Sequence, residues 1–422
     1  MKYIINGGRP LSGSVDIHGS KNSVLPILAA SLLHRGKTTL HNVPDLLDVN
    51  TSLDILRHLG AGVTRDGPDV EIDASEIIRS DIPRELMHRM RSSVIFLGAV
   101  LARMGMTTLS LPGGCELGPR PIDLHLSSLS KMGDIIEGDA GCVGCEDLTL
   151  VCRHEGLFAR DIVLPFPSVG ATENIIIAAC AAYGVTRIKN LAREPEITDL
   201  ANYINSLGGS VRGAGERVII IEGEMRLHDT VFTIPGDRIV AGTLLCAVAA
   251  CGGEAELSGI EPGRVKLPIE ILERAGCSIE PLENSIVISA KRRVRGMRRI
   301  ETAPYPAFPT DLQPPFMALA CLARGRTVFT ENIFESRYAH AAQLVEMGAR
   351  ITEDGKQAVV REIRGLRPAE LEAKDLRGGA ALMVAALATK GCSKIGGVHH
   401  IERGYEKIEQ TLSRLGADIT RG

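Results

Sequence analysis

A pair of glycines recurs six times along this chain of 422 residues. In each pair, the first glycine comes shortly after a run of small and aliphatic residues, and the second directly follows an apolar residue. The separation is about 24 residues in five pairs and 28 residues in the second pair. Self-similarity at a fixed period predicts six copies of one structural unit, one of them longer than the others. The pairs are Gly36/Gly60, Gly105/Gly133, Gly184/Gly208, Gly252/Gly276, Gly325/Gly348 and Gly391/Gly416.

Two kinds of helix are expected in each unit. Apolar residues stand four positions and one position before each second glycine, as Leu56 and Leu59 do before Gly60, which predicts an amphipathic helix ending in a left-handed glycine. The runs before several of the first glycines, such as 175–182 and 243–250, are apolar almost all round and predict buried helices. Short β-like runs lie between them. Six mixed α/β copies, with helices inside and sheets outside, are unlike a TIM barrel or a Rossmann sheet.

Composition narrows the class of protein. A chain of this length exceeds one core, so two domains are expected. The formal net charge of −3 gives no electrostatic reason to expect a nucleic acid, and the few aromatic residues argue against base stacking. No apolar run reaches membrane length and no signal peptide is evident, so we expect no membrane partner and a cytoplasmic protein whose ten cysteines stay reduced.

Three local patterns point to no metal or cofactor. Cys142 and Cys145 form a C-x-x-C pair, but a second pair with zinc spacing is missing, so a glycine-rich hairpin with incidental cysteines is the expected structure. Neither a Walker A motif nor a dinucleotide-binding glycine motif is present. The basic run KRRVRGMRR at 291–299 is interpreted as a solvated connection between two repeats.

Polar or charged residues stand at the expected start of each buried helix. A helix N-terminus favours anions, and cations placed there strengthen the attraction. Any one of these side chains could simply cap its helix and face water, but pseudo-symmetry predicts that the six starts converge on one anion-binding region. Asp311 is an acid in that setting and therefore a candidate general base. The starts are Lys21, Arg91, residues 168–170, Asp237 with Arg238, Asp311 and Arg377.

The extra length of the second repeat falls at residues 111–125, around Cys115. A lone cysteine is most often a small buried hydrophobe. Here Gly113 and Gly114 precede it and Arg120 follows, a cationic and glycine-rich setting that favours an exposed thiolate.

Long motifs along the whole chain resemble the UDP-N-acetylglucosamine 1-carboxyvinyltransferase family of enolpyruvyl transferases. They include HGSKNSVLPILAA at 18–30, LPGGCELGPRPIDLH at 111–125, FPSVGATEN at 166–174, APYPAFPTDLQ at 303–313 and HIERGYEKIE at 400–409. The resemblance implies the inside-out α/β barrel fold with two domains, each built of three pseudo-symmetric repeats. The first domain would span 20–230 and carry the Cys115 loop. The second would span 231–422 and be completed by strands from 1–19.

The resemblance also implies an activity, the first committed step of bacterial peptidoglycan synthesis. The enolpyruvyl group of phosphoenolpyruvate would move to the 3′-hydroxyl of UDP-N-acetylglucosamine with release of phosphate, without a cofactor, and the enzyme would be a target of fosfomycin. Cys115 would donate a proton and can add covalently to phosphoenolpyruvate, while Asp311 would take or hold the proton of the sugar hydroxyl.

The remaining roles that the resemblance implies are contacts with the two substrates. Phosphoenolpyruvate would be held by Lys21, Asn22, Arg120 and Arg403, with Arg337 and Arg377 nearby. The nucleotide sugar and loop closure would involve Arg91, Arg120, Pro121, Ile122, Asp123 and Leu124. The uridine diphosphate half would be contacted by Ser168, Val169, Gly170 and Ile333. One departure is Phe166, where some relatives carry lysine.

Two other functions remain open at this point. The sister enzyme that acts on shikimate phosphate shares the fold, but its motifs lack the cysteine-bearing loop. A non-catalytic six-repeat scaffold would need a basic inner surface and no reactive loop. The presence of Lys21, Cys115 and Asp311 argues against that scaffold.

Overall fold

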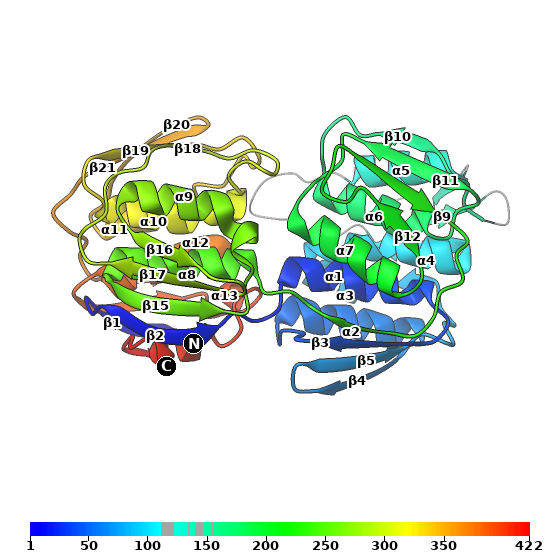
Figure 1. Cartoon of the computed structure of the whole chain (residues 1–422), viewed down its shortest axis with the longest axis horizontal. Coiled ribbons are helices and arrows are strands. Elements are labelled where there is room, and N and C mark those ends of the chain that lie inside the picture. Colours follow the sequence, from blue (N-terminus) through cyan, green and yellow to red (C-terminus); the bar gives the residue numbers. More distant parts are fainter. Residues whose placement is uncertain (111–121, 134–135, 140–146, 153–155) are drawn as a thin grey trace. The chain divides into compact units, whose positions relative to one another are not determined.

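The computed structural model describes residues 1–110, 122–133, 136–139, 147–152 and 156–422, which form two compact units. Unit 1 contains Met1–His18 and Gly236–Gly422, and unit 2 lies within residues 19–235 (Figure 1). Each unit has its own hydrophobic core.

Unit 1 contains three four-stranded sheets, and the first two strands of the chain belong to them. β1 (Tyr3–Gly7) pairs with β23 (Gly391–Gly396) and β24 (Ile419–Arg421), and β2 (Leu11–Asp16) pairs in parallel with β15 (Gly253–Ser258). Each sheet has the same plan of one parallel edge pair and two antiparallel pairs. The other strands are β16 (Ser278–Pro281), β17 (Ser285–Ala290), β18 (Arg298–Glu301), β19 (Arg326–Thr330), β20 (Arg350–Asp354), β21 (Gln357–Arg361) and β22 (Glu370–Glu372).

Unit 2 repeats this plan among its described residues. β14 (Thr230–Thr233) pairs in parallel with β3 (Lys37–His41), so the chain leaves unit 2 after Pro235, later than the expected junction at 230/231. The other strands are β4 (Gly62–Asp66), β5 (Asp69–Asp73), β6 (Asp81–Ile82), β7 (Met106–Ser110), β8 (Ile136–Asp139), β9 (Asp147–Val151), β10 (Asp161–Val163), β11 (Val185–Lys189), β12 (Ser210–Arg212) and β13 (Val218–Glu222).

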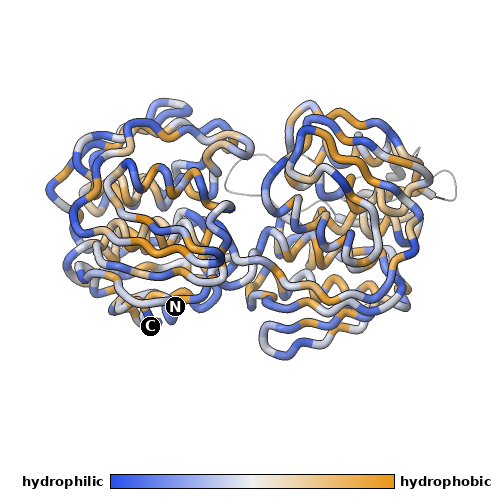
Figure 2. Tube along the Cα trace, viewed as in Figure 1, coloured by the Kyte–Doolittle hydropathy of each residue, from blue (hydrophilic) through white to orange (hydrophobic). Residues whose placement is uncertain are grey.

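Three helices form the centre of each unit. In unit 1, α8 (Arg238–Cys251), α10 (Gln313–Leu322) and α12 (Leu376–Ala388) pack against one another. In unit 2, α4 (Phe96–Met104) packs against α1 (Lys21–Ala30) and α6 (Val169–Ala179). Apolar residues follow these helices almost all round, as the sequence predicted (Figure 2).

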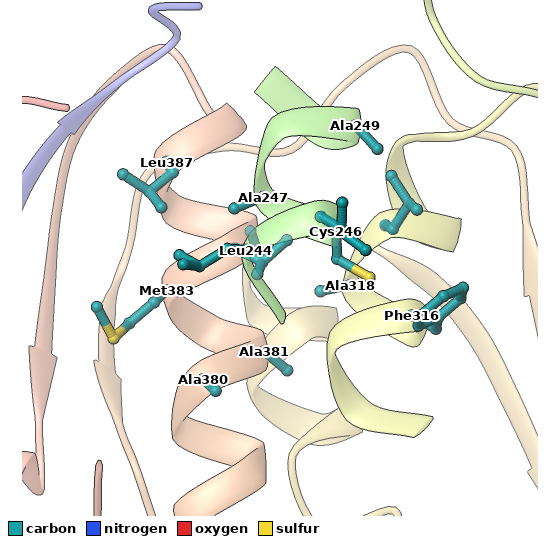
Figure 3. Packing of buried hydrophobic residues seen from close by; sticks show 14 of the residues in the cluster. Leu244, Cys246, Ala247, Ala249, Phe316, Ala318, Ala380, Ala381, Met383 and Leu387 are labelled. Atoms are coloured by element: carbon teal, nitrogen blue, oxygen red, sulfur yellow. The ribbon is translucent and has the colours of Figure 1, made fainter. Parts of the chain in front are cut away.

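Small side chains let the three central helices of unit 1 approach closely. Ala247, Ala318 and Ala381 lie between them, each at most 1 % exposed, and Leu244 lies beside them, whereas Phe316 points away from α8 and α12 (Figure 3). Burial of this apolar surface is the main source of stability, at about 25 cal/mol per Å².

Amphipathic helices occupy the second helix position of the repeats: α2 (Leu47–Leu59), α5 (Asp123–Gly133), α7 (Pro195–Ser206), α9 (Lys266–Ala275), α11 (Ala341–Glu346) and α14 (Ile408–Arg414). The expected left-handed glycine follows five of them, with φ of 111° at Gly60 and 110° at Gly276. Gly133 ends α5, and the next two residues lie outside the described part. The predicted fold class is therefore confirmed.

The described helices are too short or too polar to cross a bilayer.

Candidate functional site

Asp311 lies between two buried arginines in unit 1. It belongs to the 3₁₀ turn η4 (Thr310–Leu312), directly before α10. Its Oδ1 accepts from Arg337 Nη2 at 2.7 Å, and its Oδ2 accepts from Arg377 Nε at 3.1 Å and Nη2 at 3.0 Å. The arginine side chains are 1 % and 3 % exposed, whereas that of Asp311 is 29 % exposed. The arrangement presents a charged carboxylate to the outside, with two cations behind it.

Both arginines are fixed by further contacts. Arg337 also donates from Nε and Nη2 to the carbonyl oxygen of Thr310, at 3.2 and 3.0 Å. The guanidinium carbon of Arg377 lies 5.4 Å from the centre of the Tyr405 ring, and the Tyr405 hydroxyl bonds Thr243 Oγ1 at 2.9 Å. Burial, the largest single influence, would lower the pKa of Arg377, but Asp311, Tyr405 and Asp237 together outweigh it and raise that pKa. The Arg377 side chain therefore stays charged.

Arg377 retains one donor that nothing in the described part of the chain accepts. Its Nη1 is buried and has no hydrogen-bond partner among those residues. A buried charged donor without an acceptor is costly, so this atom is suited to an anionic ligand.

A turn beside Asp311 is held by Glu331. Glu331 Oε1 accepts from the backbone nitrogens of Ile333 and Phe334, at 2.8 and 3.1 Å, and Oε2 accepts from Thr310 Oγ1 at 3.1 Å. The same carboxylate thus connects the segment that carries Ile333 with the residue before Asp311.

The other predicted residues of unit 1 lie at helix starts or on a turn. Asp375 caps α12 by accepting from the Arg377 nitrogen at 3.0 Å, and Asp237 caps α8 by accepting from Ile239 and Val240. Arg238, the first residue of α8, is only 8 % exposed. Arg403 lies half-buried on the turn after α13 (Val398–Ile401). The predicted helix starts at 237–238 and 377 are confirmed.

In unit 2, Lys21 is the first residue of α1, as the sequence predicted. Its Nζ lies 2.6 Å from Asp48 Oδ2, and both side chains are nearly buried. Asn22 follows and is half-buried. The Ser20 hydroxyl caps the helix by accepting from the Ser23 nitrogen. Lys21 is therefore a desolvated cation held at a helix N-terminus, where anions bind most readily.

The two predicted nucleotide-binding stretches of unit 2 lie beside each other where they are described. Ser168 caps α6, and a Cβ at Gly170 would lie 3.1 Å from His125 Cε1, two residues after the start of α5 at Asp123. The Asn174 amide donates to His125 Nδ1 at 2.7 Å and to the Val94 carbonyl at 3.0 Å. α5 and the start of α6 are thereby locked together.

The neighbours of His125 keep it neutral. Burial, and then the charge of Arg91, lower the pKa of His125 from its ordinary 6.5 to about 4. Arg91 begins the 3₁₀ helix η2 (Arg91–Ile95), which leads into α4. A neutral imidazole can accept from Asn174 at its Nδ1, whereas an imidazolium cannot.

This lowered pKa predicts acid sensitivity of unit 2. Because the folded pKa lies below the unfolded one, the contribution of His125 is complete above pH 6.5 and is lost as the pH falls toward 4. The His125→Asn variant keeps an acceptor for Asn174 but cannot titrate. Between pH 7.5 and pH 5, we expect the free energy of unfolding of this variant to fall by about 2 kcal/mol less than that of the parent. Its melting temperature should therefore also fall less. The matched control is His88→Asn, at an exposed position of the same unit; equal acid sensitivity of all three proteins would contradict this role.

Three predicted residues lie outside the described part: Cys115, Arg120 and Pro121. Cys142, Cys145 and His154 lie outside it as well. Among the described cysteines, burial raises the pKa of Cys277 to about 11 and that of Cys180 to about 12, so these thiols stay protonated. The described residues include no group of three or more side chains placed to hold a metal ion.

Several contacting residues carry no clear signal in the sequence. Asp48 could have been suspected, because it is an acid in the first turn of α2 that falls on the buried face. Glu331 and Tyr405 could not have been suspected, because each bonds a residue from another part of the chain: Glu331 bonds Thr310, and Tyr405 bonds Thr243.

Comparison with known proteins gives one consistent family. The family described as EPSP synthase (3-phosphoshikimate 1-carboxyvinyltransferase) matches residues 5–412. UDP-N-acetylglucosamine 1-carboxyvinyltransferase 2 of Caldanaerobacter subterraneus subsp. tengcongensis is 45 % identical over 420 residues, which cover 100 % of this chain and 99 % of that protein. UDP-N-acetylglucosamine 1-carboxyvinyltransferase of Desulfatibacillum aliphaticivorans is 44 % identical, with the same coverage.

Solved structures share the fold. The enolpyruvyl transferase NikO from Streptomyces tendae superimposes with a TM-score of 0.88 at 25 % identity, covering 99 % of this chain and 98 % of that one. EPSP synthase from Acinetobacter baumannii gives a TM-score of 0.76 at 18 % identity over 100 % of both chains, a likeness of fold alone.

Proposed function

The chain belongs to the enolpyruvyl transferase family, within which its curated relatives are UDP-N-acetylglucosamine 1-carboxyvinyltransferases, and from this premise we propose that it joins phosphoenolpyruvate to UDP-N-acetylglucosamine. The enolpyruvyl group is transferred to the 3′-hydroxyl of the sugar, and phosphate is released. The observation that carries the proposal is the Asp311 carboxylate held between the buried guanidinium groups of Arg337 and Arg377.

The reaction has two steps, addition and elimination. In the first, the sugar oxygen bonds to C2 of phosphoenolpyruvate, the hydroxyl proton leaves, and a proton is added to the methylene carbon. In the second, that carbon loses a proton and the C–O bond to phosphate breaks, which restores the double bond. The chain must supply a base, an acid and cations for the phosphate and carboxylate.

Asp311 is suited to be the base. Its carboxylate is charged, partly exposed and fixed by two arginines, and each oxygen keeps a lone pair that can accept from the sugar hydroxyl. Arg337 and Arg377 also stabilise negative charge near the reacting carbon, and the spare Nη1 of Arg377 can bond an anionic oxygen. Cys115 is assigned the role of proton donor to the methylene carbon.

The family resemblance supplies the remaining substrate contacts of this proposal. Lys21 and Asn22, with Arg120 and Arg403, bind phosphoenolpyruvate, and Arg91 and residues 121–124 bind the nucleotide sugar. Residues 168–170 and Ile333 contact the uridine diphosphate. The locking of α5 to the start of α6 through His125 and Asn174 supports a joint role of residues 122–124 and 168–170. Phe166, 48 % exposed just before α6, offers a ring face there in place of a cation.

On this proposal the chain acts in the cytoplasm at the first committed step of peptidoglycan synthesis, and so supports cell shape and division. The shikimate-phosphate alternative has weaker support, since full-length relatives at 41–45 % identity carry the UDP-N-acetylglucosamine name. The EPSP synthase structure is only 18 % identical.

The first test is a phosphate-release assay. We expect release only when phosphoenolpyruvate and UDP-N-acetylglucosamine are both present, because elimination requires the tetrahedral adduct of the two. Each substrate alone serves as the control. Release with shikimate phosphate in place of the sugar nucleotide would overturn the assignment.

A further inference from the structure

A row of three arginines crosses one face of unit 1. Arg326 of β19 lies opposite Arg361 of β21, and Arg361 lies opposite Arg350 of β20. Residues directly opposite each other in antiparallel strands point to the same side of the sheet, with Cβ atoms about 5 Å apart. All three residues are exposed. They form one cationic row, here called the arginine face, on the sheet labelled β18 to β21 in Figure 1.

A basic segment adjoins this row. Residues 291–299 contain six lysines and arginines and no acidic residue. The segment connects β17 to β18, and its last two residues, Arg298 and Arg299, begin β18, which pairs in parallel with β19. The expected solvated connection therefore ends as an edge strand that extends the arginine face.

The positive charge of the arginine face is balanced only in part from within unit 1. No ion pair joins Arg326, Arg350 or Arg361 to a carboxylate of the described residues. Two nearby acids pair with other arginines, since Glu301 lies 2.9 Å from Arg299 and Glu362 lies 3.4 Å from Arg293, and Asp354 is the acid that shares the side of β20 with Arg350. Like charges directly opposite each other destabilise a sheet, and an external anion that covers the row would relieve this repulsion.

A sister sheet in the same unit provides an internal comparison. The sheet of β16, β17, β15 and β2 has the same strand plan, but its exposed or half-exposed positions include Glu254, Glu256 and Glu280. Glu254 lies opposite Ser289, and Glu256 lies opposite Val287. The fold of a repeat therefore does not require arginines at this face.

We propose that the arginine face binds unit 1 to the surface of an anionic phospholipid bilayer. Arginine forks bind phosphate oxygens in pairs, and several exposed arginines on one sheet face suit an extended layer of phosphates. A pocket of about 240 Å³ in unit 1 is lined by residues such as Arg238 and Tyr305 and by none from β18 to β21.

Nucleic acid fits this surface less well. Six residues share the outer side of these strands with the arginines, and none offers a ring for a base to stack on: Val328, Thr330, Thr352, Asp354, Gln357 and Val359. The arginine face is made of strands and offers no helix to enter a major groove. This proposal departs from the sequence-based expectation of no membrane partner, and it concerns binding at the surface, without insertion.

The strength of such charge-driven binding depends on the number of arginines and on the salt concentration. Each arginine near an anionic bilayer strengthens binding about fivefold, so loss of three weakens it about 100-fold. Salt screens the attraction, because the Debye length falls from about 10 Å at 0.1 M salt to about 3 Å at 1 M.

Co-sedimentation of the full chain with vesicles tests the proposal. The vesicles are phosphatidylcholine alone or phosphatidylcholine with about one third phosphatidylglycerol. The test variant is Arg326→Gln/Arg350→Gln/Arg361→Gln, and the matched control is Arg217→Gln/Lys390→Gln/Arg414→Gln, which removes the same charge from exposed positions elsewhere. Phosphate release by both variants verifies that they are folded.

We expect the parent and the control to sediment with the anionic vesicles at low salt and not with the neutral ones, and the test variant to remain in solution. Equal loss in both variants, or no sedimentation of the parent, overturns the proposal. Tighter binding of the parent to a duplex or single-stranded oligonucleotide than to the vesicles overturns it too, and assigns the face to nucleic acid.

Discussion

Replacing Asp311 by asparagine should lower turnover about 100-fold or more. The amide matches the carboxylate in size and can still accept one hydrogen bond from Arg337 or Arg377, but it cannot take the proton of the sugar hydroxyl. The two arginines are almost fully buried, so the amide also leaves their charges uncompensated. Turnover in the phosphate-release assay measures the first effect. The melting temperature measures the second.

A matched substitution separates charge removal from the role in the reaction. Asp418 also pairs with an arginine in unit 1, with 2.9 Å between its Oδ2 and Arg9 Nη2, but on the surface. The Asp418→Asn variant should retain near-normal turnover. Calorimetry should show that Asp311→Asn still binds UDP-N-acetylglucosamine, weakened by several-fold at most. If Asp311→Asn turns over within a few-fold of the parent, Asp311 is not the base.

The sequence could locate the starts of the central helices because of the repeat. Counting back from the first glycine of each copy leads to Lys21, Arg91, Arg377 and Asp311, and the structure places each of them in the first turns before or within a central helix. The pattern of buried residues repeats along the chain and is visible in the sequence of each repeat by itself. This pattern predicts where each central helix starts, because the apolar run begins at the start of the helix.

The pairing of side chains could not be read in the same way. Arg337 and Arg377 reach Asp311 from 26 and 66 residues away along the chain. The first comes from a turn without periodicity, and the sequence alone gives no distance between such a turn and a helix start. The same holds for Asp48, which meets Lys21 across two helices of one repeat. Charge complementarity fixes these pairs only after packing brings the segments together.

The arginine face illustrates a second limit. The sequence gives a net charge of −3 and a basic run at 291–299, from which a solvated connection was the natural interpretation. Strand register changes that view, because Arg326, Arg350 and Arg361 are far apart in the chain and adjacent across β19, β21 and β20. A net charge says nothing about such a row. The distribution of charge over a face depends on topology.

Fosfomycin, a phosphonate epoxide similar in shape and charge to phosphoenolpyruvate, should inactivate this enzyme by alkylating Cys115. The prediction rests on the sequence around Cys115 and on the family resemblance. Gly113, Gly114 and Arg120 favour a reactive thiolate, whereas burial raises the pKa of described thiols such as Cys180 and Cys321 to about 12. The thiolate forms a C–S bond to one epoxide carbon, and the C–O bond at that carbon breaks. The oxygen stays on the neighbouring carbon as an alkoxide and takes up a proton. UDP-N-acetylglucosamine should accelerate the reaction if its binding brings the Cys115 loop over the inhibitor.

Two variants and a mass measurement make this prediction decisive. Cys115→Asp keeps a group that can donate a proton but lacks the soft nucleophile, so it should remain active and become resistant. The control is Cys392→Ser, which removes an exposed cysteine of unit 1 and should leave both activity and sensitivity unchanged. Peptide mass mapping after treatment should find the adduct on the peptide that contains Cys115. An adduct on any other of the ten cysteines, or a Cys115→Ser protein that is inactivated as fast as the parent, removes Cys115 from the site of attack. In that case the extra length of the second repeat needs another explanation, because a nucleophile with a lowered pKa is the chemical reason to interrupt a repeat with glycines at that position.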